Sequence, residues 1–328
     1  SSRSIEVAGV PGPSGREPVD AVTGATDPRY RVGTGARVPS AVMRFTTSEV
    51  ARATGGDLFG RDVTVHGAGI DSRRVGLGEL FVPVVAERDG HAFISDALRA
   101  GARAYLTSGP IEAGTAVRVE DTVAALSALG VRARARLPER VVGITGSVGK
   151  TSLKDMLRAV GATTWRTSAS AGSFNNELGV PLTLVNAPDD TEVAVVEMGA
   201  RGTGHIAHLC EIARPTVGVV TVVAGAHLEQ FETLDEVATA KSELVAALPA
   251  SGTAVLNAED HRVAAMASAT MAPVLTFGVH DGEVRAEGVA LDDDLRASFH
   301  LRSPWGHAPV HLGVAGAHQV TTALGAAA

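Results

Sequence analysis

Residues 141–152 constrain the fold more than any other stretch of this chain. They spell Val-Val-Gly-Ile-Thr-Gly-Ser-Val-Gly-Lys-Thr-Ser. The apolar first half predicts a buried strand, and residues 153–157 continue as a predicted helix. A strand, a glycine-bearing turn and a helix form a cradle for phosphate. Glycine lets backbone N–H groups approach the phosphate oxygens, and the helix N-terminus adds partial positive charge.

The turn departs from the longest form of the phosphate-loop pattern. G-x-x-x-x-G-K-[ST] needs glycine at position 144, where the chain has Ile144, but the shorter G-x-x-G-K-T is complete. In this pattern the lysine reaches the terminal phosphates and the threonine hydroxyl holds Mg²⁺. The alternative is an ordinary glycine turn before a helix. We predict a nucleotide phosphate site made of Gly146, Ser147, Val148, Gly149, Lys150, Thr151 and Ser152.

Bulk composition limits the class of protein. A length of 328 residues allows two domains, or three small ones. The net charge of -7 gives no electrostatic reason to expect a nucleic-acid partner. The single cysteine, Cys210, leaves no internal disulfide and suits a reducing cytoplasm. No run of about 18 apolar residues occurs, so no membrane span is predicted.

Three segments differ in pattern. Residues 1–42 combine Pro and Gly with few apolar residues, which predicts a disordered or non-native leader before a natural start at Met43. A functional flexible tail is the alternative. Residues 43–138 predict a small α/β unit, and residues 139–328 a second domain. The chain stops inside an apparent helix at 324–328, so we expect a truncated C-terminus.

The expected elements define an α/β fold with a largely parallel, doubly wound sheet in the second domain. In the first unit we predict helices at 47–53, 91–100 and 123–137 and strands at 80–85 and 102–107. In the second we predict strands at 193–197, 217–223 and 254–257 and helices near 203–213 and 234–248. Residues 283–303 alternate apolar and polar, which predicts an antiparallel hairpin or meander.

Three residues are candidates for metal and phosphate chemistry. Glu197 ends an apolar strand, and ligands of open parallel sheets gather at the carboxyl ends of strands, so it is placed to bind Mg²⁺. A surface carboxylate is the alternative. His227 also follows a strand, although most of the 11 histidines must be structural or exposed. Lys241 is either an exposed partner of Glu243 or an inward lysine with an altered charge state.

Two polar stretches are candidates for substrate contacts. Asn175 and Asn176 precede a predicted helix, where they could cap it or offer amides to a carboxylate or phosphate. Asp71, Ser72 and Arg73 combine an acceptor, a hydroxyl and a guanidinium, which suit a nucleotide or a diphosphate. They could equally form a polar turn with a salt bridge.

Together these stretches resemble the Mur ligases, the ATP-dependent amide ligases of bacterial cell-wall synthesis. The resemblance covers nearly all of residues 43–328. It is carried by Ile70-Asp71-Ser72-Arg73 with Gly78 to Val82 and Asp89-Gly90-His91, by 143–152, by 174–182, and by Glu197-Met198-Gly199-Ala200 through Ala226-His227-Leu228-Glu229 to Ala240-Lys241. The family has three domains, which bind UDP, bind ATP, and complete the site with a Rossmann-like fold. The third would be missing here.

The resemblance implies roles for individual residues. It implies a UDP-sugar site at Asp71, Ser72 and Arg73, and a peptide site near Asn175 and Asn176. It implies metal ligation by Thr151, Glu197 and His227, and nucleotide contacts from Asn257 and His318. It also implies catalytic roles for Lys150, His227 and Lys241. In several relatives the lysine matched by Lys241 is carbamylated by CO₂. Gln319 departs from the family, which usually has asparagine there.

The implied reaction joins D-alanyl-D-alanine to UDP-N-acetylmuramoyl-tripeptide, with ATP and Mg²⁺, in a monomeric enzyme. Two alternatives stay open. One is a related ligase with another amine or acid, and the other is a non-catalytic nucleotide-binding relative. A general phosphate-loop kinase or GTPase explains neither the first domain nor the paired asparagines.

Overall fold

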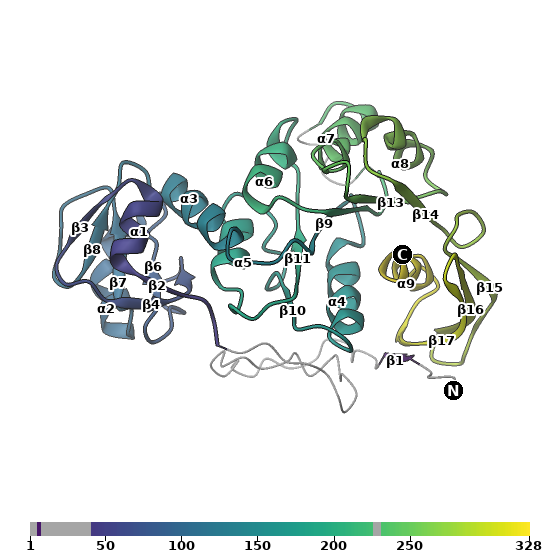
Figure 1. The fold of residues 1–328 in the computed structure, drawn as a ribbon, viewed down its shortest axis with the longest axis horizontal. Helices are drawn as coiled ribbons and strands as arrows, with labels where there is room; N and C mark the ends of the chain where they lie inside the picture. Colours follow the sequence, from purple (N-terminus) through teal and green to yellow (C-terminus); the bar gives the residue numbers. More distant parts are fainter. Residues whose placement is uncertain (1–4, 8–40, 226–230) are drawn as a thin grey trace.

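A computed structural model describes residues 5–7, 41–225 and 231–328 (Figure 1). Within these ranges the chain forms sheets of five, six, four and two strands. The α/β class predicted from the sequence is confirmed. No helix in the described ranges is long and apolar enough to cross a membrane.

The first sheet is built from short elements. It has the order β3-β8-β7-β6-β5. Its strands are β3 (Asp57–Phe59), β5 (Ala68–Gly69), β6 (Leu80–Phe81), β7 (Ala104–Thr107) and β8 (Ala116–Arg118). Beside it, β2 (Arg44–Thr46) pairs with β4 (Thr64–His66). The strand predicted at 80–85 stops after two residues, before Pro83, which has no N–H to donate to a ladder.

Capping residues fix the helices of this region. They are α1 (Thr47–Thr54), α2 (Ile94–Ala100) and α3 (Thr122–Arg134). The Thr46 and Asp121 side chains accept from the first-turn amides of α1 and α3. The helix predicted at 91–100 begins instead as a 3₁₀ turn, η1 (Gly90–Phe93), before α2, and it ends as expected at Gly101 with φ of 117°.

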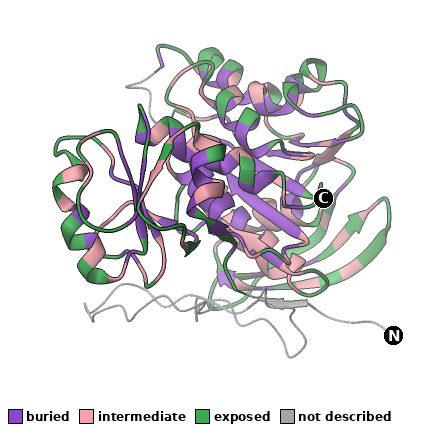
Figure 2. Ribbon diagram, turned by 60° about the vertical axis from the view of Figure 1, so that its left-hand side comes forward, coloured by how far each residue is buried: buried purple, intermediate pink, exposed green. Residues whose placement is uncertain are grey.

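The six-stranded sheet is parallel throughout. Its order is β10-β11-β9-β12-β13-β14. The strands are β9 (Val141–Thr145), β10 (Thr167–Ala169), β11 (Val193–Glu197), β12 (Val217–Val220), β13 (Thr253–Asn257) and β14 (Val274–Phe277). The predicted parallel sheet is confirmed, and Figure 2 shows its strands buried.

Alternate residues of this sheet enter two different cores, as a doubly wound fold requires. Val195 and Val219 pack in the core that holds α4 (Lys150–Gly161) and α9 (Gln319–Ala327). Val196 and Val220 face the other core. That core holds α5 (Gly179–Val185), α6 (His205–Ala213), α7 (Leu234–Ala246), α8 (His261–Ala265) and η3 (Met266–Ala269).

A curved antiparallel sheet packs beyond α9 (Figure 1). Its strands are β15 (Arg285–Leu291), β16 (Arg296–Ser303) and β17 (Gly306–Ala315), so the region is a meander that extends past the predicted 283–303. The short strand β1 (Ile5–Val7) adds in parallel to β17. Residues 5–7 therefore depart from the predicted disorder of 1–42, because two β-branched residues flanking Glu6 suit an open strand edge. The rest of 1–40 lies outside the described residues.

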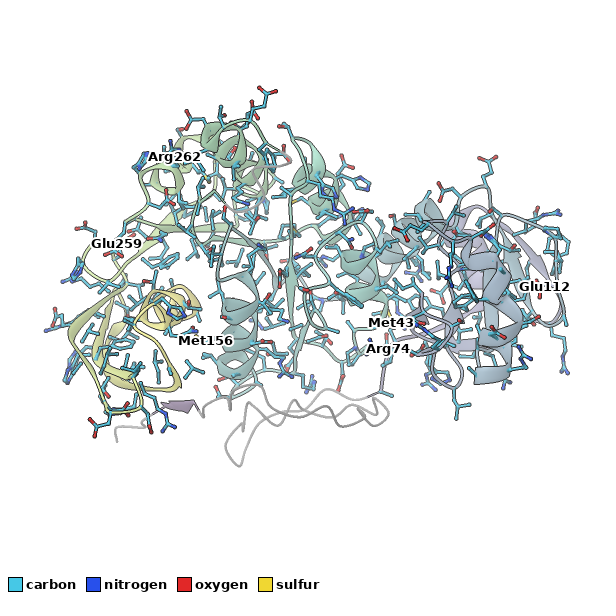
Figure 3. All side chains as sticks on the ribbon, turned by 180° about the vertical axis from the view of Figure 1, so that it is seen from behind. Met43, Arg74, Glu112, Met156, Glu259 and Arg262 are labelled. Carbon is cyan, nitrogen blue, oxygen red and sulfur yellow. The ribbon has the colours of Figure 1, made fainter. Side chains whose placement is uncertain are left out.

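The first sheet is joined tightly to the second. Asn186, just after α5, accepts from the Ala68 N–H at 2.8 Å and donates to the Ala68 carbonyl at 2.9 Å. The Arg134 guanidinium is buried and donates to four carbonyls, those of Leu137, Pro138, Ala213 and Arg214. Burial lowers the pKa of Arg134. One hydrophobic core runs from Met43 (labelled in Figure 3) across both regions.

Candidate active site

The phosphate loop is held tightly to the neighbouring strand. The Ser147 N–H donates to the Val222 carbonyl at 2.7 Å, and the Ser147 hydroxyl accepts from the Ala224 N–H at 3.0 Å. Gly146 has φ of 147°, and a Cβ there would lie 1.8 Å from the Thr221 hydroxyl. Glycine is therefore required at 146 on two counts, conformation and space.

Helix α4 begins with the charge pattern of an anion site. Gly149 caps it with φ of 86° and no side-chain hydrogen bond, and its first turn holds no acidic residue. It holds Lys150 instead, against the usual preference for acids at helix N-termini. The Lys150 ammonium donates to the Gly146 carbonyl at 2.8 Å, and burial lowers its pKa. The N–H groups of a helix N-terminus, the helix dipole and a lysine converge, as a phosphate group requires.

Glu197 lies beside this helix at the carboxyl end of β11. Its side chain is buried, and its carboxylate accepts from the Thr151 hydroxyl at 3.0 Å and from the Asn175 amide at 2.8 Å. Both donors are neutral, and a carboxylate buried against neutral donors favours a bound cation. A hydroxyl and a carboxylate are oxygen donors of the kind that Mg²⁺ takes, so these two residues fit that ion.

The third proposed metal ligand cannot be placed. His227 lies outside the described residues. Among those described, no group of three or more His, Cys, Asp or Glu side chains is arranged to hold a metal ion. Mg²⁺ commonly uses one or two carboxylates and takes its other ligands from phosphates and water, so a pair of protein ligands meets this requirement.

Lys241 is turned inward on α7. It is 5% exposed, and in the described part of the chain its ammonium has no hydrogen-bond or salt-bridge partner. Glu243, the partner that the alternative interpretation required, accepts instead from the Gly204 and Ala207 amides at the start of α6. Burial, and then the nearby charge of Lys150, lowers the pKa of Lys241 to about 8.

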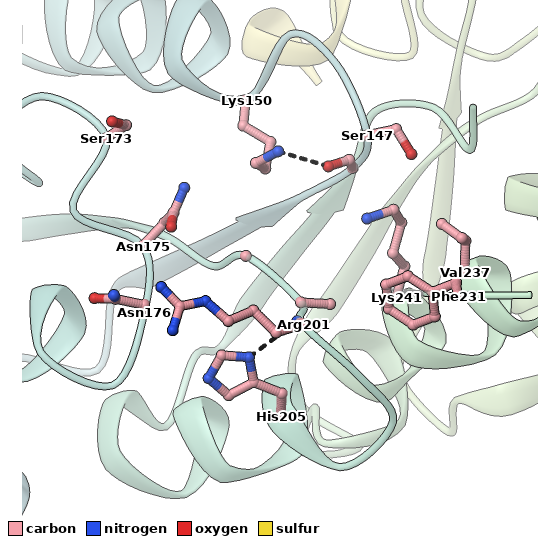
Figure 4. Close-up of a pocket in the computed structure, with 13 residues that line it drawn as sticks. Ser147, Lys150, Ser173, Asn175, Asn176, Arg201, His205, Phe231, Val237 and Lys241 are labelled. Carbon is pink, nitrogen blue, oxygen red and sulfur yellow. Dashed lines mark hydrogen bonds between the residues drawn. The ribbon is translucent and has the colours of Figure 1, made fainter. Parts of the chain in front are cut away.

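Lys150 and Lys241 face one cavity of about 250 Å³, which we call the lysine pocket (Figure 4). The phosphate loop forms one wall through Gly146 and Ser147. Arg201 and His205 stand on the opposite side. A cavity with three basic side chains and an imidazole in its wall suits an anionic ligand.

The paired asparagines have different partners. The Asn175 amide donates to Glu197, as described above. The Asn176 side-chain oxygen accepts from the Leu178 and Gly179 backbone amides at 3.3 and 2.9 Å, so it caps the turn into α5. Both also line the lysine pocket. The capping interpretation therefore fits Asn176, while Asn175 orients a carboxylate.

A second cavity, of about 270 Å³, lies on the other side of the phosphate loop, and we call it the α9 pocket. Its wall is mostly apolar and includes Val148, Leu153 and Phe277. Asn257 and His318, the two predicted nucleotide contacts, line it. The Asn257 amide donates to the Thr221 carbonyl at 2.9 Å, and its oxygen accepts from the Glu259 N–H at 3.0 Å. The nitrogen and the oxygen of the Asn257 side chain are therefore both hydrogen-bonded to backbone groups, which holds this side chain in the pocket wall.

The departure at Gln319 has a structural counterpart. The Gln319 amide nitrogen lies 3.2 Å from the His318 ring, while its side-chain oxygen is buried with no hydrogen-bond partner in the described structure.

The predicted UDP-sugar residues Asp71, Ser72 and Arg73 line a separate cavity of about 660 Å³, within residues 43–138. Asp71 binds Arg73 through two hydrogen bonds of 2.9 Å, which lower the pKa of the Asp71 carboxyl. The Arg73 side chain is 86% exposed. Asp71, Ser72 and Arg73 thus form a salt-bridged turn, and the same turn forms the wall of the cavity.

Sequence analysis missed Arg201 and His205 in the lysine pocket. Glu177 links them, since it lies 3.3 Å from the Arg201 guanidinium and 3.2 Å from the His205 ring. The signal was the loop 199–205, which carries charged groups directly after Glu197 at the strand end.

A parallel sheet with a phosphate loop between β9 and α4 and a cavity on each side of that loop defines a phosphate-loop α/β protein. Comparison with known families narrows this class: the chain belongs to the Mur ligases, because residues 144–328 match the family model of the Mur ligase middle domain.

Individual relatives agree with this assignment. The UDP-N-acetylmuramoyl-tripeptide--D-alanyl-D-alanine ligase of Mycobacterium tuberculosis is 40% identical over 319 residues, which cover 88% of this chain and 62% of the relative. That of Escherichia coli is 35% identical, covering 88% and 64%. The crystal structure of MurF from Acinetobacter baumannii superposes with a TM-score of 0.80 at 29% identity, covering 88% and 65%. The chain spans less than two thirds of the length of these relatives.

Proposed function

We propose that this chain forms the UDP- and ATP-binding part of a ligase that joins D-alanyl-D-alanine to UDP-N-acetylmuramoyl-tripeptide. The observation that carries the proposal is the lysine pocket, where the half-buried Lys150 and the buried Lys241 meet at the phosphate loop, next to the buried Glu197 carboxylate. The names of the relatives supply the substrates. In this proposal residues 43–138 bind the UDP-sugar and residues 139–328 bind ATP.

In the proposed reaction an oxygen of the terminal carboxylate of the tripeptide attacks the γ-phosphorus of ATP, the bond to the bridging oxygen of ADP breaks, and ADP and an acyl phosphate form. The amine of the dipeptide then attacks the acyl phosphate, a tetrahedral intermediate collapses, and phosphate leaves. Lys150 and the amides of the α4 N-terminus neutralise the transferred group and hold it in line. Thr151 and Glu197 would hold Mg²⁺, with His227 as a further ligand, and the ion would supply charge neutralisation at the phosphates.

In this proposal each of the two cavities beside the phosphate loop binds a different substrate. The α9 pocket would take the nucleoside of ATP, between apolar side chains and the Asn257 and His318 groups. A relative from Thermotoga maritima was solved in complex with ADP, which supports a nucleotide at this fold; it superposes with a TM-score of 0.69 at 28% identity and covers 79% of this chain and 61% of its own. The lysine pocket would take the carboxylate end of the tripeptide, near Asn175 and Asn176.

Lys241 would act as a carbamate. With a pKa of about 8, Lys241 is a neutral amine in roughly a tenth of the molecules at pH 7. The ammonium first loses one proton. The neutral amine nitrogen then attacks CO₂, a C–N bond forms as a C=O π bond breaks, and the nitrogen loses a second proton, so that a cation becomes an anion. That anion would help to position the metal ion and relieve the repulsion by Lys150.

ADP release tests the proposal. The assay supplies Mg-ATP and UDP-N-acetylmuramoyl-tripeptide, with and without D-alanyl-D-alanine, and uses Lys150→Ala as the control. Because the chain spans 62% of the M. tuberculosis relative, it is run on this chain and on the product of the full gene. Release that needs the dipeptide and is absent in the control supports the proposal.

Other outcomes separate the alternatives. Release that responds to a different amine would keep the chemistry and change the substrate. ATP binding without release by the full product would favour a non-catalytic relative. A monomeric, cytoplasmic enzyme is part of the proposal, and sedimentation of the full product tests the first of these properties.

A further inference from the structure

The chain uses lysine sparingly. Its 29 Lys and Arg residues comprise three lysines, Lys150, Lys154 and Lys241, and 26 arginines. Lys150 and Lys241 face the lysine pocket. Lys154 lies one turn beyond Lys150 on α4, is 2% exposed, and has no part in the proposed reaction. A position that keeps lysine in an arginine-rich chain, and buries it, calls for a specific role.

The Lys154 ammonium has three oxygen atoms around it, two carbonyls and one carboxylate. Its Nζ donates to the Ser170 carbonyl at 3.0 Å and to the Gly172 carbonyl at 2.6 Å, and it lies 3.3 Å from an Asp155 carboxylate oxygen. An ammonium has donors and no acceptor, so two carbonyls take its hydrogen bonds and the carboxylate balances its charge. Three acceptors that converge on one nitrogen suit the compact ammonium better than a planar guanidinium.

The two carbonyls belong to the loop between β10 and α5, residues 170–178. The ends of this loop are bound to β11 and its extension. The Ser170 hydroxyl accepts from the Glu197 N–H at 3.2 Å, and the Asn175 carbonyl accepts from the Gly199 N–H at 2.7 Å. Residues 171–174 between them are exposed. Lys154 supplies the hydrogen bond from α4 to the middle of this exposed segment, at Gly172.

The same loop carries the amide that orients Glu197. Asn175 follows three residues after Gly172, and its side chain donates to Glu197, whose other oxygen accepts from Thr151 on α4. Helix α4 therefore reaches the carboxylate by two routes, directly through Thr151 and indirectly through Lys154 and the loop.

We propose that Lys154 is a positioning residue that holds the 170–175 loop against α4 and thereby keeps Asn175 on Glu197 at the metal edge of the phosphate site. The link between loop and helix is independent of any ligand. Its effect on the metal rests on the proposed function, in which Glu197 holds Mg²⁺. Loss of Lys154 should therefore weaken nucleotide binding in the presence of Mg²⁺ and leave nucleotide binding without Mg²⁺ nearly unchanged.

Hydrogen exchange tests the loop and calorimetry tests the metal. In Lys154→Met we expect the amides of 171–175 to exchange about tenfold faster. Affinity for ATP without Mg²⁺ should stay within about twofold, while the gain in affinity on adding Mg²⁺ should fall about tenfold. Lys154→Arg should recover part of both, because a guanidinium can still donate to the loop carbonyls.

Met156→Ala is the matched control. Met156 is buried on the same helix but packs in the core on the side of α9 (labelled in Figure 3). It should lower stability without speeding exchange of the loop relative to the rest of the chain. Equal loop exchange in Lys154→Met and wild type, or equal acceleration in Met156→Ala, would overturn the proposal, as would Lys154→Arg behaving like Lys154→Met. If wild type binds no nucleotide, the proposed function fails, while the exchange data still decide the role of Lys154 in the loop.

Discussion

The cavities on the two sides of the phosphate loop differ in what surrounds them. The lysine pocket has charged groups in its wall, and behind them the buried Glu197 accepts from Thr151 and Asn175. The α9 pocket is walled by Leu153, Phe277 and other apolar groups, and its buried Asn257 is fully engaged by the backbone. The lysine pocket therefore suits a charged ligand group that basic side chains neutralise. The α9 pocket suits a flat apolar group that is recognised by its shape. Substitutions on the charged side should therefore change ligand affinity most.

Lys150→Ala should have the largest effect. It removes a cation at the start of α4, and a charge-assisted contact to phosphate is strong enough that ATP affinity should fall about 100-fold. Calorimetric titration measures this loss. Arg158→Ala, which removes a cation from the last turn of the same helix, is the control. An equal loss in both variants would show that net charge rather than position matters.

Gly146→Ala tests the loop that separates the pockets. The new Cβ would lie 1.8 Å from the Thr221 hydroxyl, which donates to the Val148 carbonyl at 2.7 Å. Together with the strained φ, this should lower the free energy of unfolding by about 3 kcal/mol. At Gly149, with φ of 86° and nothing within 4 Å, alanine should cost about 1 kcal/mol. Urea unfolding measures both, and similar losses would contradict the steric argument.

As long as Lys241 is not carbamylated, as in a CO₂-free buffer, Lys241→Met should stabilise the protein at pH 7 while removing a residue of the lysine pocket. The pKa of Lys241 is about 8 when folded and 10.5 ordinarily, so folding disfavours its cation. Well below pH 8 both states are protonated and the penalty is complete, about 3 kcal/mol. As pH rises from 8 towards 10.5 the folded state loses its proton first, so the wild type recovers stability and the gain from methionine shrinks. Urea unfolding at pH 7 and pH 9.5 measures the gain.

Lys154→Met is the control for that experiment, because it removes a buried ammonium that has two carbonyl acceptors and a carboxylate partner. It should destabilise the protein at pH 7. If Lys241→Met were also destabilising, the interpretation of Lys241 as a cation that has no partner among residues 41–225 and 231–328 would be wrong.

Asn257→Ala should have the smallest effect on ligand binding. Two backbone groups, at Thr221 and Glu259, lose a partner, so the free energy of unfolding should fall by about 1–2 kcal/mol. ATP affinity should fall only about threefold if shape dominates recognition in the α9 pocket. Thermal unfolding and calorimetry measure the two effects. A loss as large as that of Lys150→Ala would remove the contrast between the pockets.

Local patterns explain what the sequence could predict. The strands at β9 and β11 and the start of α4 follow from apolar runs and from a glycine turn, which need no distant partner. Glu197 could be assigned to a sheet edge because parallel strands end together. The same reasoning fails at β6, where Pro83 limits the ladder, and it missed the third strand of the meander.

Contacts between distant segments explain what it could not predict. Asn175 and Asn176 are identical in type and adjacent, yet one binds Glu197 and the other caps the turn into α5. Lys154 follows a helical pattern like any surface lysine, and only the returning loop at Ser170 and Gly172 buries it. The orientation of Lys241 depends in the same way on α6 engaging Glu243.

The concentration of every lysine around one loop also has a practical consequence. Amine-directed reagents, which normally spread over the surface of a protein, find here no other side-chain amine than these three. An aldehyde or activated ester built onto a nucleotide would be guided to Lys150 or Lys241 by its own binding. Incorporation of ¹⁵N-lysine would give a spectrum with three side-chain signals, and each would come from the site or from the helix that supports it.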